Sequence, residues 1–96
     1  MPYIKKENRA LIDNAVTKLA DNVLNVGEIN YAITKFLHIV IRRDKFCYAL
    51  LNSMIGVLEC AKLELYRMVA GPYEDKRRME NGPVSELDAK SLEDVR

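Results

Sequence analysis

The longest helical pattern in the chain runs from Phe46 to Ala70. Its apolar residues recur at alternating spacings of four and three, which draws one stripe along a helix: Cys47, Leu51, Met54, Leu58, Ala61, Leu65 and Met68. The opposite side carries small residues, namely Ala49, Ser53, Gly56 and Cys60. Because a glycine inside a helix costs about 1 kcal/mol relative to alanine, Gly56 predicts a close helix–helix contact. We expect this helix to lie centrally in a bundle or at a subunit interface.

Two shorter helices are predicted before it. The residues from Glu7 to Leu24 alternate as an amphipathic helix with one apolar face. Asn25 followed by Glu28 is typical of a capping box, so a second helix is predicted from Val26 to about Arg43. Asp44 is the expected cap of the long helix. The connection is so short that the second helix and the long helix should be antiparallel neighbours.

The sequence after the long helix allows two interpretations. Pro72 either ends that helix or kinks a continuing one, and residues 72–81 form a short fourth helix or a kinked extension that stops at Gly82. Residues 83–96 carry few apolar side chains among charges and serines, which predicts a flexible or docked tail. We therefore expect one helical domain over residues 1–82.

The predicted fold is all-α: an antiparallel bundle of three main helices plus the short C-terminal helix, completed by dimerisation. The 96 residues suffice for one domain. Leu63 stands on the otherwise polar flank of the long helix, and three helices from one chain do not easily cover so much apolar surface. A two-fold interface would use the same patch twice, so a homodimer or higher homo-oligomer is expected.

Composition and charge limit the partners and the cellular location that we expect for the protein. The net charge of +1 argues against broad attraction to nucleic acid or to an anionic membrane. The most apolar run, Tyr31–Ile41, is too short to cross a bilayer, and the N-terminus has no apolar signal region. Cys47 and Cys60 would lie about 20 Å apart on one helix, too far for a disulfide. Reduced, buried thiols and a cytoplasmic location are the expectation.

Polar residues interrupt two of the apolar stripes. Lys62 falls inside the stripe of the long helix with Glu59 one turn away, and Asn30 falls inside the stripe of the second helix with Thr34 beside it. One interpretation is a binding site in which Glu59 is an acid, base or ligand and Lys62 holds an anion. The favoured interpretation is a structural polar network that fixes the register of the two helices. In both, Glu59 and Lys62 should be partly buried and should bond to each other or to Asn30.

Other reactive side chains form no recognisable site in the sequence. His38 is the only histidine, and no helix-spaced carboxylate beside it completes a set of metal ligands. The cysteines match no metal-binding or redox spacing. The basic run from Lys76 to Arg78 lies among acidic residues, as on a solvated surface, and no glycine-rich phosphate loop is present. We therefore predict no catalytic residue, no metal and no cofactor.

Several stretches of the chain resemble a small family of uncharacterised bacterial and phage proteins. They are residues 27–34, residues 56–67, Pro72–Lys76 and Glu80–Gly82. The resemblance covers residues 1 to about 84 and implies no activity. It marks as motif positions Asn30, Glu59, Lys62, Glu64 and Tyr73 to Asp75.

A weaker similarity is to the all-α nucleotide pyrophosphohydrolases of the MazG kind. Those enzymes hold Mg²⁺ near phosphates with carboxylates in ExxE and ExxD spacing. Here Tyr31 follows Glu28 at that spacing, and Glu59 and Glu64 are five residues apart on different faces, so the metal set is incomplete. The sequence thus favours a non-enzymatic structural module, or one that binds an unidentified protein partner. The alternative is a small Mg²⁺-dependent nucleotide pyrophosphohydrolase-like enzyme.

Overall fold

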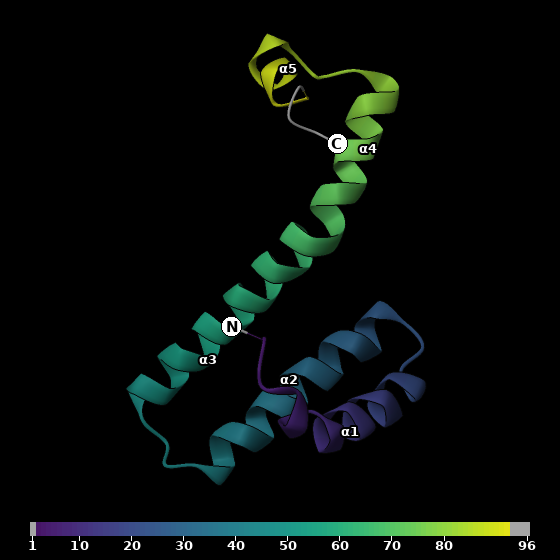
Figure 1. Cartoon of the computed structure of the whole chain (residues 1–96). Coiled ribbons are helices and arrows are strands. Elements are labelled where there is room, and N and C mark those ends of the chain that lie inside the picture. Colours follow the sequence, from purple (N-terminus) through teal and green to yellow (C-terminus); the bar gives the residue numbers. More distant parts are fainter. Residues whose placement is uncertain (1, 93–96) are drawn as a thin grey trace. The chain divides into compact units, whose positions relative to one another are not determined.

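The fold of the protein is described by a computed structural model, which places residues 2–92 and the side chains of residues 2–89. All regular structure in these residues is helical, so the predicted all-α class is confirmed (Figure 1). The elements in chain order are η1 (Lys6–Asn8), α1 (Ala10–Asp21), α2 (Val26–Arg43), α3 (Tyr48–Leu65), η2 (Tyr66–Ala70), α4 (Gly71–Asn81) and α5 (Glu86–Leu92). The chain divides into two compact units, Met1–Leu58 and Glu59–Arg96, which are described separately.

The turn between α1 and α2 has the predicted capping box. The Asn25 side chain accepts a hydrogen bond from the Glu28 backbone N–H at 2.8 Å, and the Glu28 carboxylate accepts one from the Leu24 N–H at 2.7 Å. These bonds satisfy two N–H groups that would otherwise lack partners at the start of α2. The predicted limits of α2, Val26 and Arg43, are confirmed. Helix α1 ends earlier than expected, where the Asn22 side-chain amide donates to the Lys18 carbonyl at 2.7 Å.

The connection from α2 to α3 differs from the prediction. Helix α3 begins at Tyr48, four residues after the expected cap. The Asp44 carboxylate instead lies 3.5 Å from Nε of Arg43, and the first turn of α3 is closed by the Leu51 N–H donating to the Cys47 carbonyl at 3.2 Å. The assignment of Asp44 as the cap was therefore wrong, because a neighbouring guanidinium takes up its side chain.

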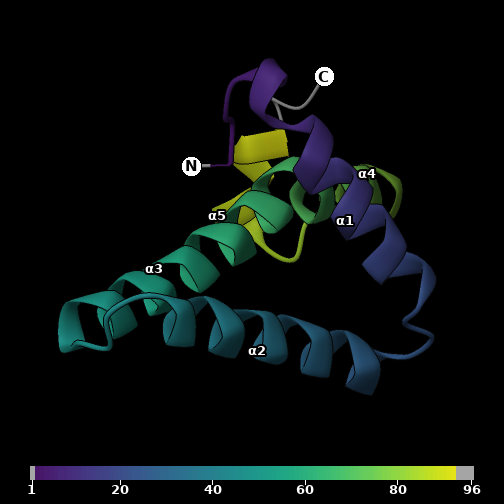
Figure 2. The same cartoon turned by 90° about the horizontal axis from the view of Figure 1, so that it is seen from below.

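The apolar stripes of the first unit are open to solvent. None of the side chains in residues 2–89 is buried, and in the first unit the exposure of large apolar groups reaches 88% at Leu24. Figure 2 shows that short connections join α1 to α2 and α2 to α3. The helices predicted from the stripes are present, whereas the packed bundle core that would cover them stays a prediction.

The second unit shows that Pro72 does not end the long helix. After α3 the chain continues through a π-helical turn, Tyr66–Ala70, directly into α4. The Gly71 N–H donates to the Tyr66 carbonyl five residues earlier, which is the π spacing. Helix α4 then stops at Gly82, as predicted, where φ is +90° and the N–H donates to the Arg78 carbonyl at 2.8 Å. Of the two interpretations, the continuing helix is confirmed.

A further helix, α5, lies in the segment expected to be a tail. Its start is a second capping box: the Leu87 N–H donates to the Ser85 hydroxyl at 3.2 Å, and the Asp88 carboxylate accepts from the Ser85 N–H at 2.9 Å. The hydrogen bond from the Ser85 backbone is the main cause of a lowered pKa of the Asp88 carboxyl. The expected domain boundary near residue 82 is not tested, and residues 93–96 of the expected tail lie outside the described residues.

Candidate interaction surface

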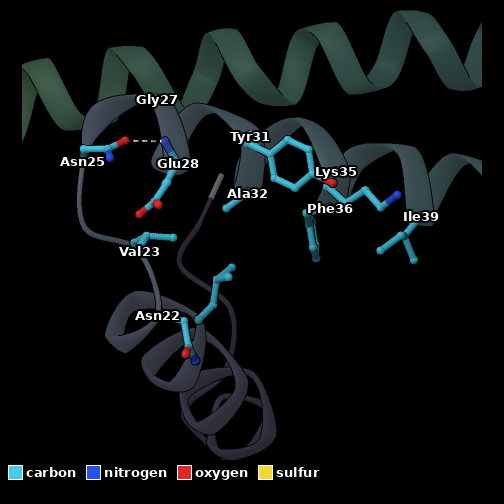
Figure 3. Close-up of a pocket in the computed structure, with 11 residues that line it drawn as sticks. Asn22, Val23, Asn25, Gly27, Glu28, Tyr31, Ala32, Lys35, Phe36 and Ile39 are labelled. Atoms are coloured by element: carbon cyan, nitrogen blue, oxygen red, sulfur yellow. Dashed lines mark hydrogen bonds between the residues drawn. The ribbon is translucent and has the colours of Figure 1, made fainter.

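Helices α1 and α2 line an apolar hollow, the α1–α2 groove, with a volume of about 650 Å³ (Figure 3). Its lining residues are Leu19, Asn22, Val23, Asn25, Gly27, Glu28, Tyr31, Ala32, Lys35, Phe36 and Ile39. In the close-up, Phe36 and Ile39 point from α2 toward the side on which α1 lies, and the Asn25–Glu28 cap closes one end. Polar groups therefore lie at the edge of this groove. Two of them, Asn25 and Glu28, form the hydrogen bonds that cap the start of α2.

A second hollow, the α2–α3 groove, lies on another face of α2 and has a volume of about 430 Å³. Its lining residues are Asn30, Ile33, Thr34, Leu37, His38, Ile41, Leu51, Met54, Ile55 and Leu58. A smaller hollow of about 280 Å³ beside Phe46 shares His38, Ile41 and Leu51 with it. The apolar surface is thus continuous from Asn30 to the connection that precedes α3.

The polar groups of the α2–α3 groove follow one line along α2. Asn30, Thr34 and His38 are spaced four residues apart, which places them one above another on a helix. The Thr34 hydroxyl donates to Oδ1 of Asn30 at 3.4 Å. The sequence pattern predicts Asn30 and Thr34 as polar residues that interrupt an apolar stripe, and His38 is the only histidine of the chain. The structure brings all three into one groove.

Glu59 and Lys62 form the expected ion pair, but in solvent. Nζ of Lys62 lies 2.9 Å from Oε1 of Glu59, and their side chains are 67% and 57% exposed, respectively. The expected pairing of the two residues with each other is thus confirmed. Within their own unit no described element covers the helical stripe around the pair. Asn30 belongs to the other unit, so the burial of the pair against α2 and its link to Asn30 stay predictions.

Three arginines of the second unit contact side chains on their own helical surface. Arg67 pairs with Glu64 at 3.0 Å. Arg77 donates to the Tyr73 hydroxyl at 3.0 Å and stacks over the ring of Tyr73, 5.4 Å from its centre. Arg78 lies 3.6 Å from Asp75. Both arginines of the basic run thus make helix-surface contacts, in agreement with the solvated-face interpretation.

The two cysteines are free, but both are exposed, so the prediction of buried thiols was wrong. Gly56 has open space around it: apart from its chain neighbours and its own helix backbone, no atom of the described residues of its unit lies within 4 Å of a Cβ built on it. The predicted close helix–helix contact at Gly56 is therefore not seen within that unit and stays a prediction. Within residues 2–92, no three potential metal ligands gather, and no helix is long and apolar enough to cross a membrane.

Comparison with known families places these features in context. The family described as a domain of unknown function, DUF6899, matches residues 1–84. The chain belongs to the DUF6899 family. This confirms the expectation of an uncharacterised family, whereas a bacterial or phage origin stays an expectation. The match ends between α4 and α5, so both grooves lie inside the family domain and α5 lies outside it.

No curated protein and no solved structure matches the chain significantly. The DUF6899 match names no activity. The exposed surfaces of the protein itself are therefore the basis for a proposal about its function.

Proposed function

We propose that this DUF6899 protein is a non-enzymatic interaction module that works as a homodimer, with the helices of two copies completing one antiparallel bundle. One observation supports the proposal above all others: no side chain in residues 2–89 is buried. Apolar stripes recur at helical spacing on α1, α2 and α3, so the chain has the material for a core. In the proposal, a second copy covers these stripes.

The charged residues support a module better than an enzyme. Glu59 and Lys62, the binding candidates of the second unit, form an exposed pair of a kind worth less than about 1 kcal/mol. The third candidate, Asn30, lies in an apolar groove with Thr34 and His38 rather than beside a carboxylate. In the proposal, Asn30 takes part in the dimer contact. The protein acts in the cytoplasm of a bacterium or as a phage product, with a protein partner still to be found.

The test measures mass and stability together. Light scattering should give the mass of two chains at micromolar concentration. The thermal midpoint should rise with protein concentration, because folding and association are linked in an obligate dimer. The proposal would be overturned if the protein is a folded monomer at high micromolar concentration and its thermal midpoint does not depend on protein concentration. A thermal shift caused only by Mg²⁺ with a nucleotide would favour the enzyme instead.

A further inference from the structure

We propose that residues 83–92 form a strap on helix α4, in which α5 is helical while it is docked on α4 and is released when the attraction between Asp88 of α5 and Arg78 of α4 is screened. Both helices belong to the second unit, so the strap is independent of the first unit and of the proposed homodimer. The DUF6899 match ends at residue 84, before α5 begins. The strap is therefore an addition to the family domain that covers part of a helix of that domain.

Helix α5 returns to α4 after the chain turns at Gly82, and the two helices are in contact (Figure 1). Along α5, Asp88 and Ala89 are half-buried, whereas Leu87 is 92% exposed. The large apolar side chain of Leu87 therefore lies away from the contact, and a carboxylate and a small side chain lie closer to it. Charge, rather than burial of Leu87, is what holds α5 on α4.

The charge on α4 that attracts Asp88 belongs to Arg78. The side chain of Arg78 is only 25% exposed, and its Nε is buried. Nη2 of Arg78 lies 3.6 Å from Oδ1 of Asp75, one turn earlier on α4. The hydrogen bond from the Ser85 backbone and, to a smaller extent, the positive charge of Arg78 lower the pKa of the Asp88 carboxyl. A guanidinium that has lost much of its hydration is stabilised by nearby carboxylates, of which α5 supplies one.

The short length of α5 makes its helix depend on this contact. It has seven residues, and isolated helices shorter than about 12 to 15 residues are marginal in water because nucleation is costly. The Asp88 carboxylate accepts from the Ser85 N–H at 2.9 Å, and the Ala89 N–H donates to the Ser85 carbonyl at 3.2 Å. Asp88 thus both caps α5 and faces the positive charge on α4. Helix formation and docking are therefore coupled through one side chain.

A contact held by charge should respond to salt. At about 1 M salt, electrostatic attraction is screened over roughly 3 Å, whereas apolar burial does not depend on this screening. Release of α5 would remove its cover from α4 and leave Arg78 with its neighbour Asp75. The strap thus has two states, and ionic strength shifts the balance between them.

The test replaces one of two adjacent arginines of α4 in the full chain. Arg78→Met removes the charge that attracts Asp88 and leaves the cap of α5 in place. Arg77→Met is the matched control, because Arg77 contacts Tyr73 on α4 itself. The NMR Cα shifts of residues 86–92 report the helix population of α5. Their helical component should fall by roughly half or more in Arg78→Met and by less than about a tenth in Arg77→Met. About 1 M NaCl should produce the larger loss in the unmodified chain.

A second pair of substitutions decides the matter if Arg78→Met also alters the Cα shifts of α4. Asp88→Asn keeps an oxygen that can accept from the Ser85 N–H but removes the charge. Glu86→Gln removes a charge from an exposed position in the same turn of α5. Asp88→Asn should lose the helical shifts of α5, and Glu86→Gln should keep them.

Three results would overturn the strap. One is an α5 that is as helical in Arg78→Met as in Arg77→Met while α4 is intact. Another is an α5 whose helical shifts do not change with salt. The third is the same α5 signal in Asp88→Asn and Glu86→Gln. The proposed homodimer is tested separately, by its mass and its dependence on concentration.

Discussion

Gly71→Ala is a substitution whose effect should differ from that of alanine elsewhere in a helix. The backbone at Gly71 is ordinary helix, with φ −58° and ψ −53°, so alanine meets no conformational strain there. However, its Cβ would lie 3.1 Å from the Tyr66 carbonyl oxygen and 3.9 Å from Cε1 of the Tyr66 ring. That same oxygen accepts the Gly71 N–H and closes the π turn. The new methyl group would therefore lie too close to the Tyr66 carbonyl oxygen, which accepts the hydrogen bond from the Gly71 N–H.

The magnitude follows from two opposing contributions. Replacing glycine by alanine in a helix interior stabilises by about 1 kcal/mol. The 3.1 Å contact forces the Tyr66 carbonyl to move by a few tenths of an ångström and weakens a hydrogen bond of net worth about 1 kcal/mol. Because the two contributions nearly cancel, we expect the free energy of unfolding of Gly71→Ala to stay within about 0.5 kcal/mol of that of the unmodified protein.

A double-mutant cycle with Pro72 tests the physical cause. Proline lacks an N–H, and its ring crowds the carbonyl four residues back, that of Met68. We attribute the π turn to this crowding. In a Pro72→Ala background the helix can return to regular spacing, so Gly71→Ala should stabilise it by about 1 kcal/mol. Urea unfolding of the four proteins at one fixed concentration measures the coupling. Effects that add within about 0.5 kcal/mol would refute the reasoning.

Two further predictions concern charged groups of the second unit. The pKa of Asp88 in the folded protein lies below its ordinary value of 3.8. The carboxylate's contribution to α5 is therefore fully present above that ordinary value and is lost as the pH falls through the lowered pKa. Carbon-detected NMR titration should show this, and a midpoint at or above 3.8 would contradict it. For Glu59 and Lys62, a cycle with Glu59→Gln and Lys62→Met should give a coupling of about 0.2 to 0.5 kcal/mol that shrinks with added salt. Coupling of several kcal/mol would instead mean that the pair is buried when the protein is assembled.

The sequence predicted those helix ends that depend on bonds between near neighbours. Asn25 and Glu28 gave the start of α2, and Gly82 gave the end of α4. The same signal was present at Ser85 and Asp88, three residues apart, and would have revealed α5. The segment has few apolar residues to bury, which favours a tail over a helix in a prediction from sequence.

Other features of the structure could not be predicted from a single sequence. Asp44 has the chemistry of a cap, but the side chain of Arg43 competes for it. A stripe of apolar residues says which face of a helix avoids water, but not which element covers it. Glu59, Lys62 and Cys60 are exposed because no described element of their own unit covers this part of α3. Asn30 was recognised as unusual, yet its neighbours in the groove depend on how α3 follows α2.

The capping boxes have a consequence for the order of folding. The bonds of Asn25 with Glu28, and of Ser85 with Asp88, join residues three apart. Contacts this local form quickly, since little chain entropy is lost in closing them. If the core is completed between chains, the slow step of refolding is their encounter. The refolding rate should then increase with protein concentration, while helix signals appear early and without such dependence.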